Sequence, residues 1–245
     1  MKFKCLKLVT FDATNTLLKF RSPPWNHYAI VAREYGFQGS EIDVKNCLLD
    51  SYNVMLERHP NFGRSTIYWK EWWTQIVKMT FKGRLPVDAN INKIAERLID
   101  EFKTSKCWSK AEGSERLISL LQKSGISLGV ISNTDPRLHE VLYNINLDKL
   151  FEFVVTSYES GFCKPSKEIF EYAMNKSHKN LMASECLHIG DDLEKDYNGA
   201  RNAGWHALIV SENAKVKEHL YFTSCQSLND DQDVVLILIV IKYNC

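Results

Sequence analysis

The sequence has almost no net charge and no long block of like charges. Its 31 basic and 30 acidic residues leave a formal net charge of +1 over 245 residues. Proteins that bind nucleic acid or an anionic membrane surface usually carry a basic patch that is visible in the sequence. The absence of such a patch predicts no nucleic-acid partner and no membrane partner, and it favours a small-molecule ligand.

Long apolar runs are also missing. The longest, VVLILIVI at residues 234–241, is far shorter than the roughly 20 residues that a membrane-spanning helix needs. Residues 232–245 are either an edge strand or an alternative terminus, and the apolar run should promote aggregation if it is exposed. At the amino end, MKFKCLKLVTFD enters the first apolar stretch without the successive regions of a signal peptide. We therefore expect a cytoplasmic location, with the nucleus open as a second one.

The cysteines form neither close pairs nor metal-binding clusters. There are seven, an odd number, without a C-x-x-C pair and without the Cys/His spacing of a zinc site: Cys5, Cys47, Cys107, Cys163, Cys186, Cys225 and Cys245. This usage predicts reduced thiols in an intracellular compartment.

Short apolar segments that end in polar residues are present instead. Five such segments are rich in β-forming residues: 6–12, 126–133, 151–157, 186–192 and 206–210. Their hydrophobicity is continuous rather than alternating, which is typical of strands that are covered on both faces of a parallel sheet. Helical patterns lie between them, at 114–125, 166–176 and 196–204. This alternation predicts an α/β fold with a doubly wound, Rossmann-like parallel sheet.

More than a hundred residues separate the first two predicted strands, too many for one crossover helix. Apolar residues recur at helical spacing within this insertion, among them Trp69, Trp72 and Trp73. We interpret the tryptophans as core residues rather than as ligand-stacking residues. The predicted organisation is an α/β core of residues 1–19 and 106–245 with an inserted helical cap of residues 20–105.

Polar residues follow the predicted strands where each strand ends. They are Asp12, Ser132, Asn133, Asp191 and Asp192. In an open α/β sheet, ligands bind outside the carboxyl ends of the strands, so these side chains should converge. Each alone could be a helix cap or a turn former, but together with Lys164 they supply a nucleophile, a hydroxyl donor, a cation and a pair of acids.

This combination suits phosphoryl transfer. A carboxylate such as Asp12 can attack phosphorus as a nucleophile, and with Asp191 it can hold Mg²⁺, which prefers oxygen ligands. Ser132 and Lys164 would donate to the remaining phosphate oxygens, where charge is spread in the transition state. The predicted cofactor is Mg²⁺, and the predicted partner is a small phosphorylated substrate.

Four stretches of the chain resemble, in order, the four motifs of the haloacid dehalogenase superfamily. They are TFDATNTLL (10–18), VISNTD (130–135), KPSKEIF (164–170) and HIGDDLEKDYNGA (188–200). The resemblance covers the core from residue 6 to about residue 210. It implies a Mg²⁺-dependent phosphatase of a small phosphorylated metabolite that acts through an aspartyl-phosphate.

The resemblance also implies a role for each matching residue. Asp12 would be the nucleophile, and Ser132, Asn133 and Lys164 would bind the substrate phosphate. The metal site would consist of Asp12, the backbone carbonyl of Thr14, Asp191 and Asp192. Asp192, like Asp196, would lie around the metal or orient Lys164.

Thr14 departs from the pattern, since superfamily phosphatases usually have a second aspartate there as general acid and base. A threonine hydroxyl cannot shuttle a proton as general acid and base near neutral pH, and a positioned acid–base group is worth about 10²–10⁴ in rate. A threonine at this catalytic position resembles the P-type ATPases, whose aspartyl-phosphate persists. Asn15 replaces the usual glycine, and because asparagine tolerates a left-handed backbone, the turn should be preserved.

Two other functions remain open from the sequence. The first is a catalytically degenerate protein that binds a phosphorylated ligand or a protein partner. The second, a dehalogenase, is less favoured because that branch works without the metal site that these acids would form. The sequence indicates neither the substrate nor the oligomeric state.

Overall fold

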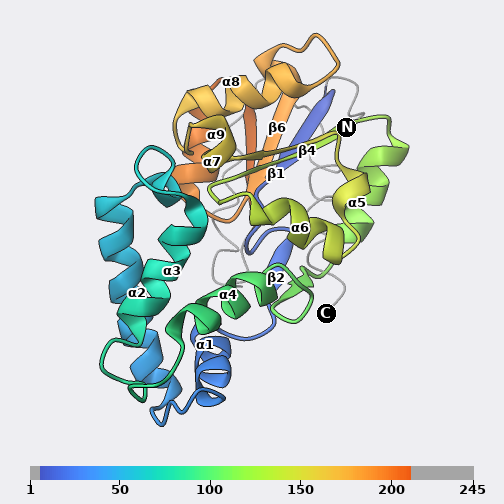
Figure 1. Cartoon of the computed structure of the whole chain (residues 1–245). Coiled ribbons are helices and arrows are strands. Elements are labelled where there is room, and N and C mark those ends of the chain that lie inside the picture. Colours follow the sequence, from blue (N-terminus) through green and yellow to red (C-terminus); the bar gives the residue numbers. More distant parts are fainter. Residues whose placement is uncertain (1–5, 211–245) are drawn as a thin grey trace. The chain divides into compact units, whose positions relative to one another are not determined.

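The computed structural model describes residues 6–210, which form two compact units (Figure 1). An α/β unit contains residues 6–19, 110–132 and 149–210, and a helical unit contains residues 20–109 and 133–148. The cap expected at residues 20–105 falls within the helical unit. That the chain is divided into a core domain and a cap domain stays a prediction. The apolar run 234–241, the rest of residues 232–245, and Cys5, Cys225 and Cys245 lie outside the described residues.

A five-stranded sheet organises the α/β unit. Its strands are β1 (Leu8–Phe11), β4 (Ser127–Ser132), β5 (Phe153–Thr156), β6 (Cys186–Gly190) and β7 (His206–Ile209). They pair in the order β5-β4-β1-β6-β7, and every pairing is parallel. The first strand is therefore central, with β4 and β6 as its neighbours. The predicted α/β class and parallel sheet are confirmed.

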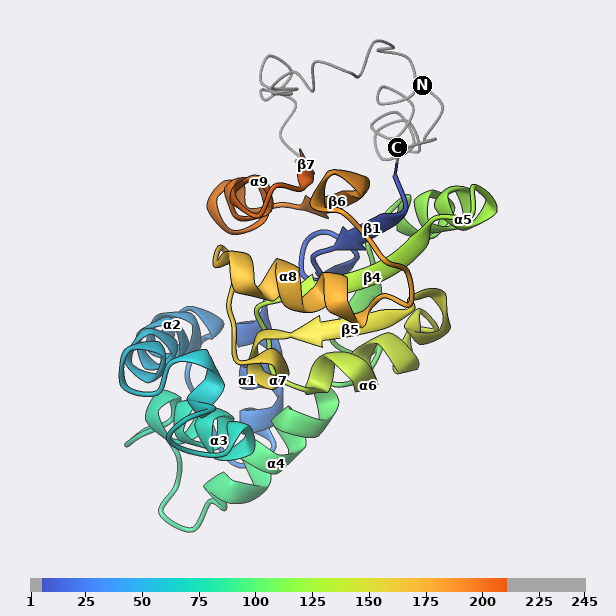
Figure 2. The same ribbon diagram turned by 90° about the horizontal axis from the view of Figure 1, so that it is seen from above.

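Helices cover both faces of this sheet. They are α5 (Ser114–Lys123), α7 (Ser157–Ser160), α8 (Lys167–Lys176) and α9 (Gly199–Asn202), with a π-helical turn (Leu193–Asn198) before α9 and a 3₁₀ turn (Ala183–Glu185) before β6. Figure 2 shows α8 and α9 on one face and α5 on the other. The fold is thus doubly wound, as the alternation of strands and helices predicts.

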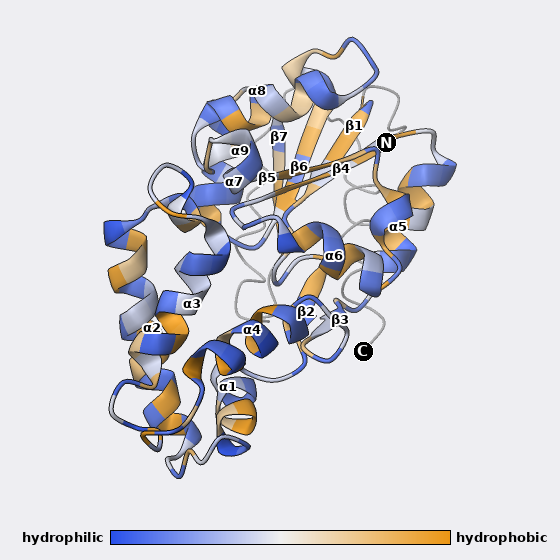
Figure 3. Ribbon diagram, viewed as in Figure 1, coloured by the Kyte–Doolittle hydropathy of each residue, from blue (hydrophilic) through white to orange (hydrophobic). Residues whose placement is uncertain are grey.

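The core on the α8 and α9 face is apolar and closely packed. Leu8 of β1, Cys186 of β6, Phe170 of α8 and Trp205 belong to one buried hydrophobic cluster, and all four are at most 1% exposed. Figure 3 shows the apolar colouring of β1, β4 and β6. Burial of this area supplies the main stabilisation of the unit.

The helical unit is built from α1 (Pro24–Arg33), α2 (Glu41–Arg58), α3 (Trp69–Thr80), α4 (Ile91–Glu101) and α6 (Arg137–Asn144), with a 3₁₀ turn (Asn61–Gly63) after α2. The short strands β2 (Leu18–Phe20) and β3 (Trp108–Lys110) pair with each other, and each contains a point at which the chain leaves one unit for the other. A 3₁₀ turn (Asp148–Leu150) lies where the chain returns to the α/β unit. None of the helices between residues 6 and 210 combines the length and the apolarity that a bilayer span requires.

The tryptophans of α3 serve mainly as core residues. Trp72 is 0% exposed and donates its indole N–H to the carbonyl oxygens of Met55 and His59. Trp69 is also buried, whereas Trp73 is half-buried and donates to an aspartate outside α3. The structure thus agrees with the interpretation of the stripe as core.

That aspartate, Asp135, belongs to a buried ion pair within the helical unit. Asp135 accepts two hydrogen bonds from the Arg137 guanidinium, at 2.9 and 2.7 Å, and one from Trp73 at 2.8 Å. The guanidinium also lies over the Trp73 ring, 4.4 Å from its centroid. Burial alone would raise the pKa of Asp135, but Arg137 and Trp73 outweigh it and lower that pKa. The segment after β4 is therefore attached to α3 through Trp73, which donates to Asp135 and lies against the Arg137 guanidinium.

We expect Asp135→Ala to destabilise the protein by about 3–5 kcal/mol, because it leaves the Arg137 charge buried without its carboxylate. Urea denaturation followed by far-UV circular dichroism measures the change. Asp100→Ala is the matched control, since Asp100 pairs with Lys103 at an exposed position and its loss should matter little. Equal losses of unfolding free energy in the two variants would show that the buried pair stabilises the protein no more than the exposed one.

Candidate active site

Asp12 lies directly after β1 at the carboxyl edge of the sheet. Its backbone N–H donates to Ile189 of β6 at 2.8 Å, so the strand ladder itself positions the residue. The following loop turns back at Asn15, whose φ is 61° and whose N–H donates to Leu18. Asn15 thus adopts the left-handed backbone expected where the family pattern has glycine. Asp12 is left 8% exposed at the start of this turn.

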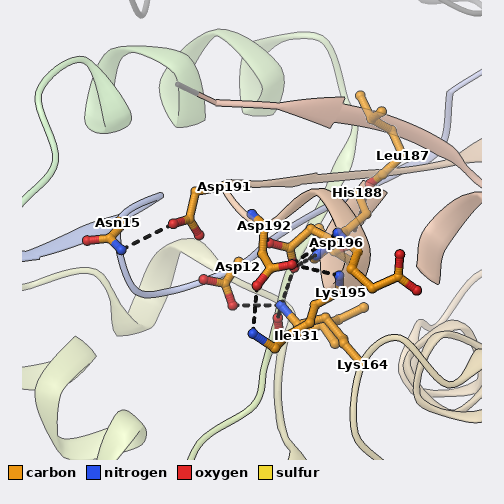
Figure 4. A network of polar contacts seen from close by, with 12 residues as sticks. Asp12, Asn15, Ile131, Lys164, Leu187, His188, Asp191, Asp192, Lys195 and Asp196 are labelled. Carbon is orange, nitrogen blue, oxygen red and sulfur yellow. Dashed lines mark hydrogen bonds and ion pairs between the residues drawn. The ribbon is translucent and has the colours of Figure 1, made fainter. Parts of the chain in front are cut away.

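Lys164 lies against Asp12 and is almost fully buried. Its ammonium donates to Asp12 Oδ1 and to Asp196 Oδ1, each at 2.6 Å, and to the Ile131 carbonyl oxygen at 2.8 Å (Figure 4). These acceptors come from three different segments of the chain. Burial would lower the pKa of Lys164, but the two carboxylates outweigh it and raise that pKa. The lysine is therefore a fixed positive charge at the centre of the site.

Asp196 reaches the site because the π-helical turn folds back over the end of β6. A Cβ on Gly190 would lie 2.2 Å from Asp196 Cγ, so only glycine leaves room for this carboxylate. A second close approach occurs at Gly199, where a Cβ would lie 2.8 Å from Pro165 Cα. Two glycines thus allow the turn and the segment around Lys164 to come together.

Hydrogen bonds hold both oxygens of the Asp196 carboxylate. Oδ2 accepts from the Asp192 backbone N–H at 3.0 Å, and Oδ1 lies 3.1 Å from His188 Nε2. Burial would raise the pKa of Asp196, but His188 and Lys164 lower it well below its ordinary range. Burial also lowers the pKa of His188 itself. Asp196 is therefore a carboxylate and His188 a neutral imidazole at neutral pH.

Asp191 completes a group of three acids. It is half-buried, and its Oδ2 accepts a hydrogen bond from the Asn15 amide at 3.1 Å (Figure 4). One oxygen from each of Asp12, Asp191 and Asp196 lies within 4.8 Å of the others. Burial raises the pKa of both Asp12 and Asp191. Three carboxylates against one ammonium leave a negative site suited to a hard cation.

The other predicted site residues occupy different surroundings. The Asp192 carboxylate caps the π-helical turn by accepting the N–H groups of Glu194 and Lys195, and it pairs with the Lys195 ammonium at 2.6 Å. Thr14 is half-buried in the loop after Asp12, where its backbone bridges to Leu18.

Ser132 and Asn133 fall on either side of the division between units. Ser132 is buried at the end of β4, next to Ile131, whose carbonyl oxygen binds Lys164. Asn133 begins the segment assigned to the helical unit. The structure thus brings Asp12, Lys164 and Asp191 together, and the functional role of each predicted residue stays a prediction.

Two buried residues of this network were not among the sequence candidates. Thr10 Oγ1 lies 2.8 Å from His188 Nδ1, and both residues are 0% exposed. The signal available in the sequence was a polar residue inside each of two apolar strands, LVTF and CLHIG. On its own such a residue is weak evidence, because the face to which it points depends on strand pairing.

The described cysteines are all free, as expected. They are Cys47, Cys107, Cys163 and Cys186. Burial raises the pKa of the Cys107 and Cys186 thiols to about 12. Both are therefore protonated, structural thiols at neutral pH.

The parallel sheet, with a carboxylate after its first strand and a buried lysine against it, defines a haloacid dehalogenase-like hydrolase. The family model with this description matches residues 6–204, and the chain belongs to this family. The chain is 37% identical over 239 residues to the rhythmically expressed gene 2 protein of Drosophila melanogaster, covering 94% of this chain and 90% of that protein. It is 32% identical to human haloacid dehalogenase-like hydrolase domain-containing protein 3, covering 84% and 82%.

Solved structures of distant sequence share the fold. A structure of YfnB from Bacillus subtilis bound to magnesium has a TM-score of 0.60 at 20% identity, covering 84% of this chain and 86% of that one. A HAD phosphatase from Thermococcus onnurineus has a TM-score of 0.58 at 20% identity, with coverages of 88% and 91%. The L-2-haloacid dehalogenase from Xanthobacter autotrophicus has a TM-score of 0.62 at 17% identity, with coverages of 86% and 79%. One fold thus accommodates both named chemistries, and the fold alone does not choose between them.

We expect Lys164→Met to destabilise the protein by about 3–5 kcal/mol, because Asp12 and Asp196 would then face each other in a buried site without a cation. The double variant Lys164→Met/Asp12→Asn should be more stable than Lys164→Met, since it removes one of the two like charges. Urea denaturation in the presence of a chelator measures both. Lys167→Met, at a lysine whose side chain is 59% exposed, is the control, and a Lys164→Met protein as stable as this control would contradict the electrostatic account.

Proposed function

We propose that the chain is a Mg²⁺-dependent phosphatase that hydrolyses a small phosphorylated metabolite through an aspartyl-phosphate on Asp12. The observation that carries the proposal is the group of three carboxylates, Asp12, Asp191 and Asp196, two of which (Asp12 and Asp196) are paired with one buried ammonium. A phosphate dianion could not approach three carboxylates unaided, so this arrangement calls for a divalent cation between them.

The residues present fit such a cation. Asp12 and Asp191 supply oxygen ligands from adjacent strand ends, and the Thr14 carbonyl is the backbone ligand that the family pattern implies. Asp196 completes the acidic group, whereas the Asp192 carboxylate is engaged with Lys195. When bound, Mg²⁺ would polarise the phosphoryl group and offset charge on its oxygens. The family membership and the magnesium in the YfnB structure support this choice.

Asp12 is positioned to act as the nucleophile. Lys164 holds Oδ1, so attack through Oδ2 leaves that hydrogen bond in place. The bond between Asp12 oxygen and phosphorus forms as the bond from phosphorus to the leaving oxygen breaks, and the leaving oxygen takes up a proton from solvent. Water then attacks phosphorus and gives up a proton to solvent, which releases inorganic phosphate and the free carboxylate. The Lys164 ammonium offsets negative charge in both steps.

Thr14 shapes the kinetics of this scheme. Without a carboxylic acid at this position, neither protonation of the leaving oxygen nor activation of water has its usual group. Substrates with good leaving groups should react faster in the first step, and the aspartyl-phosphate should persist in the second. The proposed enzyme is therefore slow or specialised.

We expect an aryl phosphate to leave a covalent phosphoryl adduct on the wild-type protein and none on Asp12→Asn. Intact-mass measurement after rapid quench detects the adduct. Thr14→Asp should raise steady-state turnover by up to the roughly 10²–10⁴ of a positioned acid–base group, because it restores the missing acid. Thr14→Asn is the matched control. Asparagine is similar in size to aspartate but cannot act as a general acid or base, so it should give no gain in turnover. An adduct that survives in Asp12→Asn would place the nucleophile elsewhere.

We expect Mg²⁺ to raise the melting temperature, since a ligand that binds only the folded state stabilises it. Asp191→Asn and Asp196→Asn should weaken Mg²⁺ binding at least tenfold. Asp192→Asn should change it less than threefold, because asparagine keeps the cap and the aspartate is already engaged with Lys195. Calorimetric titration measures the affinities, and turnover that withstands thorough chelation would exclude the metal-dependent scheme.

A catalytically degenerate binding protein is the second candidate, and Thr14 is the observation that favours it. Such a protein would bind phosphate and Mg²⁺ but form no adduct and gain nothing from Thr14→Asp. A dehalogenase would instead release halide from a 2-haloacid without added metal. The same set of variants therefore separates the three functions.

A further inference from the structure

A chain of buried hydrogen bonds runs behind the candidate active site. Thr10 Oγ1 lies 2.8 Å from His188 Nδ1, and His188 Nε2 lies 3.1 Å from Asp196 Oδ1. The same oxygen accepts from Lys164 at 2.6 Å, and Lys164 also donates to Asp12 (Figure 4). Thr10, His188, Asp196 and Lys164 are each at most 3% exposed, so water does not compete for these bonds.

The sheet sets the geometry of this chain. Thr10 of β1 and His188 of β6 are register partners, so their side chains leave the sheet side by side. Asp12 follows Thr10 by two residues and points to the same face. The ring of Phe170 meets the His188 ring edge-on at 5.4 Å and closes the apolar side of the imidazole. His188 is thus held between a hydroxyl, a carboxylate and an aromatic ring.

Hydrogen-bond geometry favours one tautomer of His188. The Asp196 carboxylate only accepts, so His188 Nε2 carries the proton that points to it. In this Nε2–H tautomer Nδ1 is an acceptor, and the Thr10 hydroxyl at 2.8 Å can donate to it. The other acceptor near that hydroxyl, the Leu187 carbonyl oxygen, lies at 3.5 Å, the outer limit for such a bond. A donating Thr10 hydroxyl thus stabilises the same tautomer that the Asp196 carboxylate requires.

We propose that Thr10 and His188 are positioning residues: the Thr10 hydroxyl fixes the Nε2–H tautomer of His188, which in turn holds the Asp196 carboxylate against Lys164. Through Lys164 the chain orients Asp12. The predicted effect on kcat rests on the proposed phosphatase function, because orienting Asp12 would speed up its attack on phosphorus. Loss of the outer partners that orient the ligands of a metal site typically costs 10- to 100-fold in metal affinity or activity, and we expect an effect of that size here.

The test replaces only the hydroxyl. Thr10→Val keeps the shape and removes the donor, Thr10→Ser restores a donor, and Thr80→Val is the control. Thr80 is equally buried, and its hydroxyl donates to Ile76 within α3. We expect kcat to fall by about 10- to 100-fold in Thr10→Val with KM little changed, to recover in Thr10→Ser, and to stay at the wild-type value in Thr80→Val.

The ring nitrogens of His188 give a second readout that a merely structural role would not move. In ¹⁵N-labelled protein, with the signals assigned through His188→Gln, the wild type should show a protonated Nε2 and a hydrogen-bonded, unprotonated Nδ1. Thr10→Val should shift Nδ1 to the position of a nitrogen without a donor, and Thr10→Ser should restore it. A wild-type ring protonated at Nδ1 would overturn the proposal, as would unchanged ring signals and unchanged kcat in Thr10→Val.

The two proposals can fail separately. If the wild type has no phosphatase activity with adduct formation, the proposed function falls, while the ring signals still decide the tautomer. Hydrogen exchange of the Lys164 ammonium then replaces kcat as the readout of positioning. Exchange should be slow in wild type and Thr80→Val and faster in Thr10→Val and His188→Leu, and equal rates in all four would overturn the positioning role.

Discussion

The ammonium of Lys164, buried between the carboxylates of Asp12 and Asp196, is the interaction on which the candidate site depends. Two carboxylates that share a dry site repel each other, and each would tend to take up a proton if it lacked a partner. One cation that bonds both, at 2.6 Å each, offsets this repulsion and fixes the separation of the two carboxylates. The residues involved come from the end of β1, the segment before α8 and the turn after β6, so this contact also joins distant parts of the chain. This contact requires glycine at positions 190 and 199, because a methyl group at Gly190 would collide with Asp196 and one at Gly199 would collide with Pro165.

One face of the sheet changes character along its strands. Leu8 and Cys186 lie in the apolar core beneath α8 and α9, while Thr10 and His188, two residues further along the same strands, form a buried polar pair. Asp12 and Gly190 follow at the carboxyl edge. Alternate residues of a strand share a face, so one face of β1 and β6 carries apolar residues first, then a polar pair, and a charged residue at the carboxyl edge. The strand register that packs the core therefore also sets the positions of the site residues.

The chain is a member of a hydrolase family whose fold is shared by a phosphatase and by a dehalogenase. The choice of reaction must then come from side chains rather than from the sheet. Under the proposed function, the three acids and the lysine would favour a cation and a phosphate, whereas Thr14 would withhold the group that makes phosphate turnover fast. Such an enzyme would be slow in its second half-reaction, because Asp12 and Lys164 would supply the nucleophile and its orienting cation while the general acid–base group is missing.

The sequence by itself determined the strands, their parallel class and the acids at their ends, because continuous apolar runs and the polar residues that stop them are local features of the chain. It also indicated Asp12, Lys164 and Asp191 through the order of four motifs, and it anticipated the left-handed Asn15. It could not decide between Asp192 and Asp196 as the third acid beside Asp12, since that depends on a π-helical turn that carries one carboxylate inward and leaves the other on Lys195. Nor could it identify Thr10 and His188 as partners, because only the pairing of β1 with β6 gives two residues 178 positions apart one register and one face.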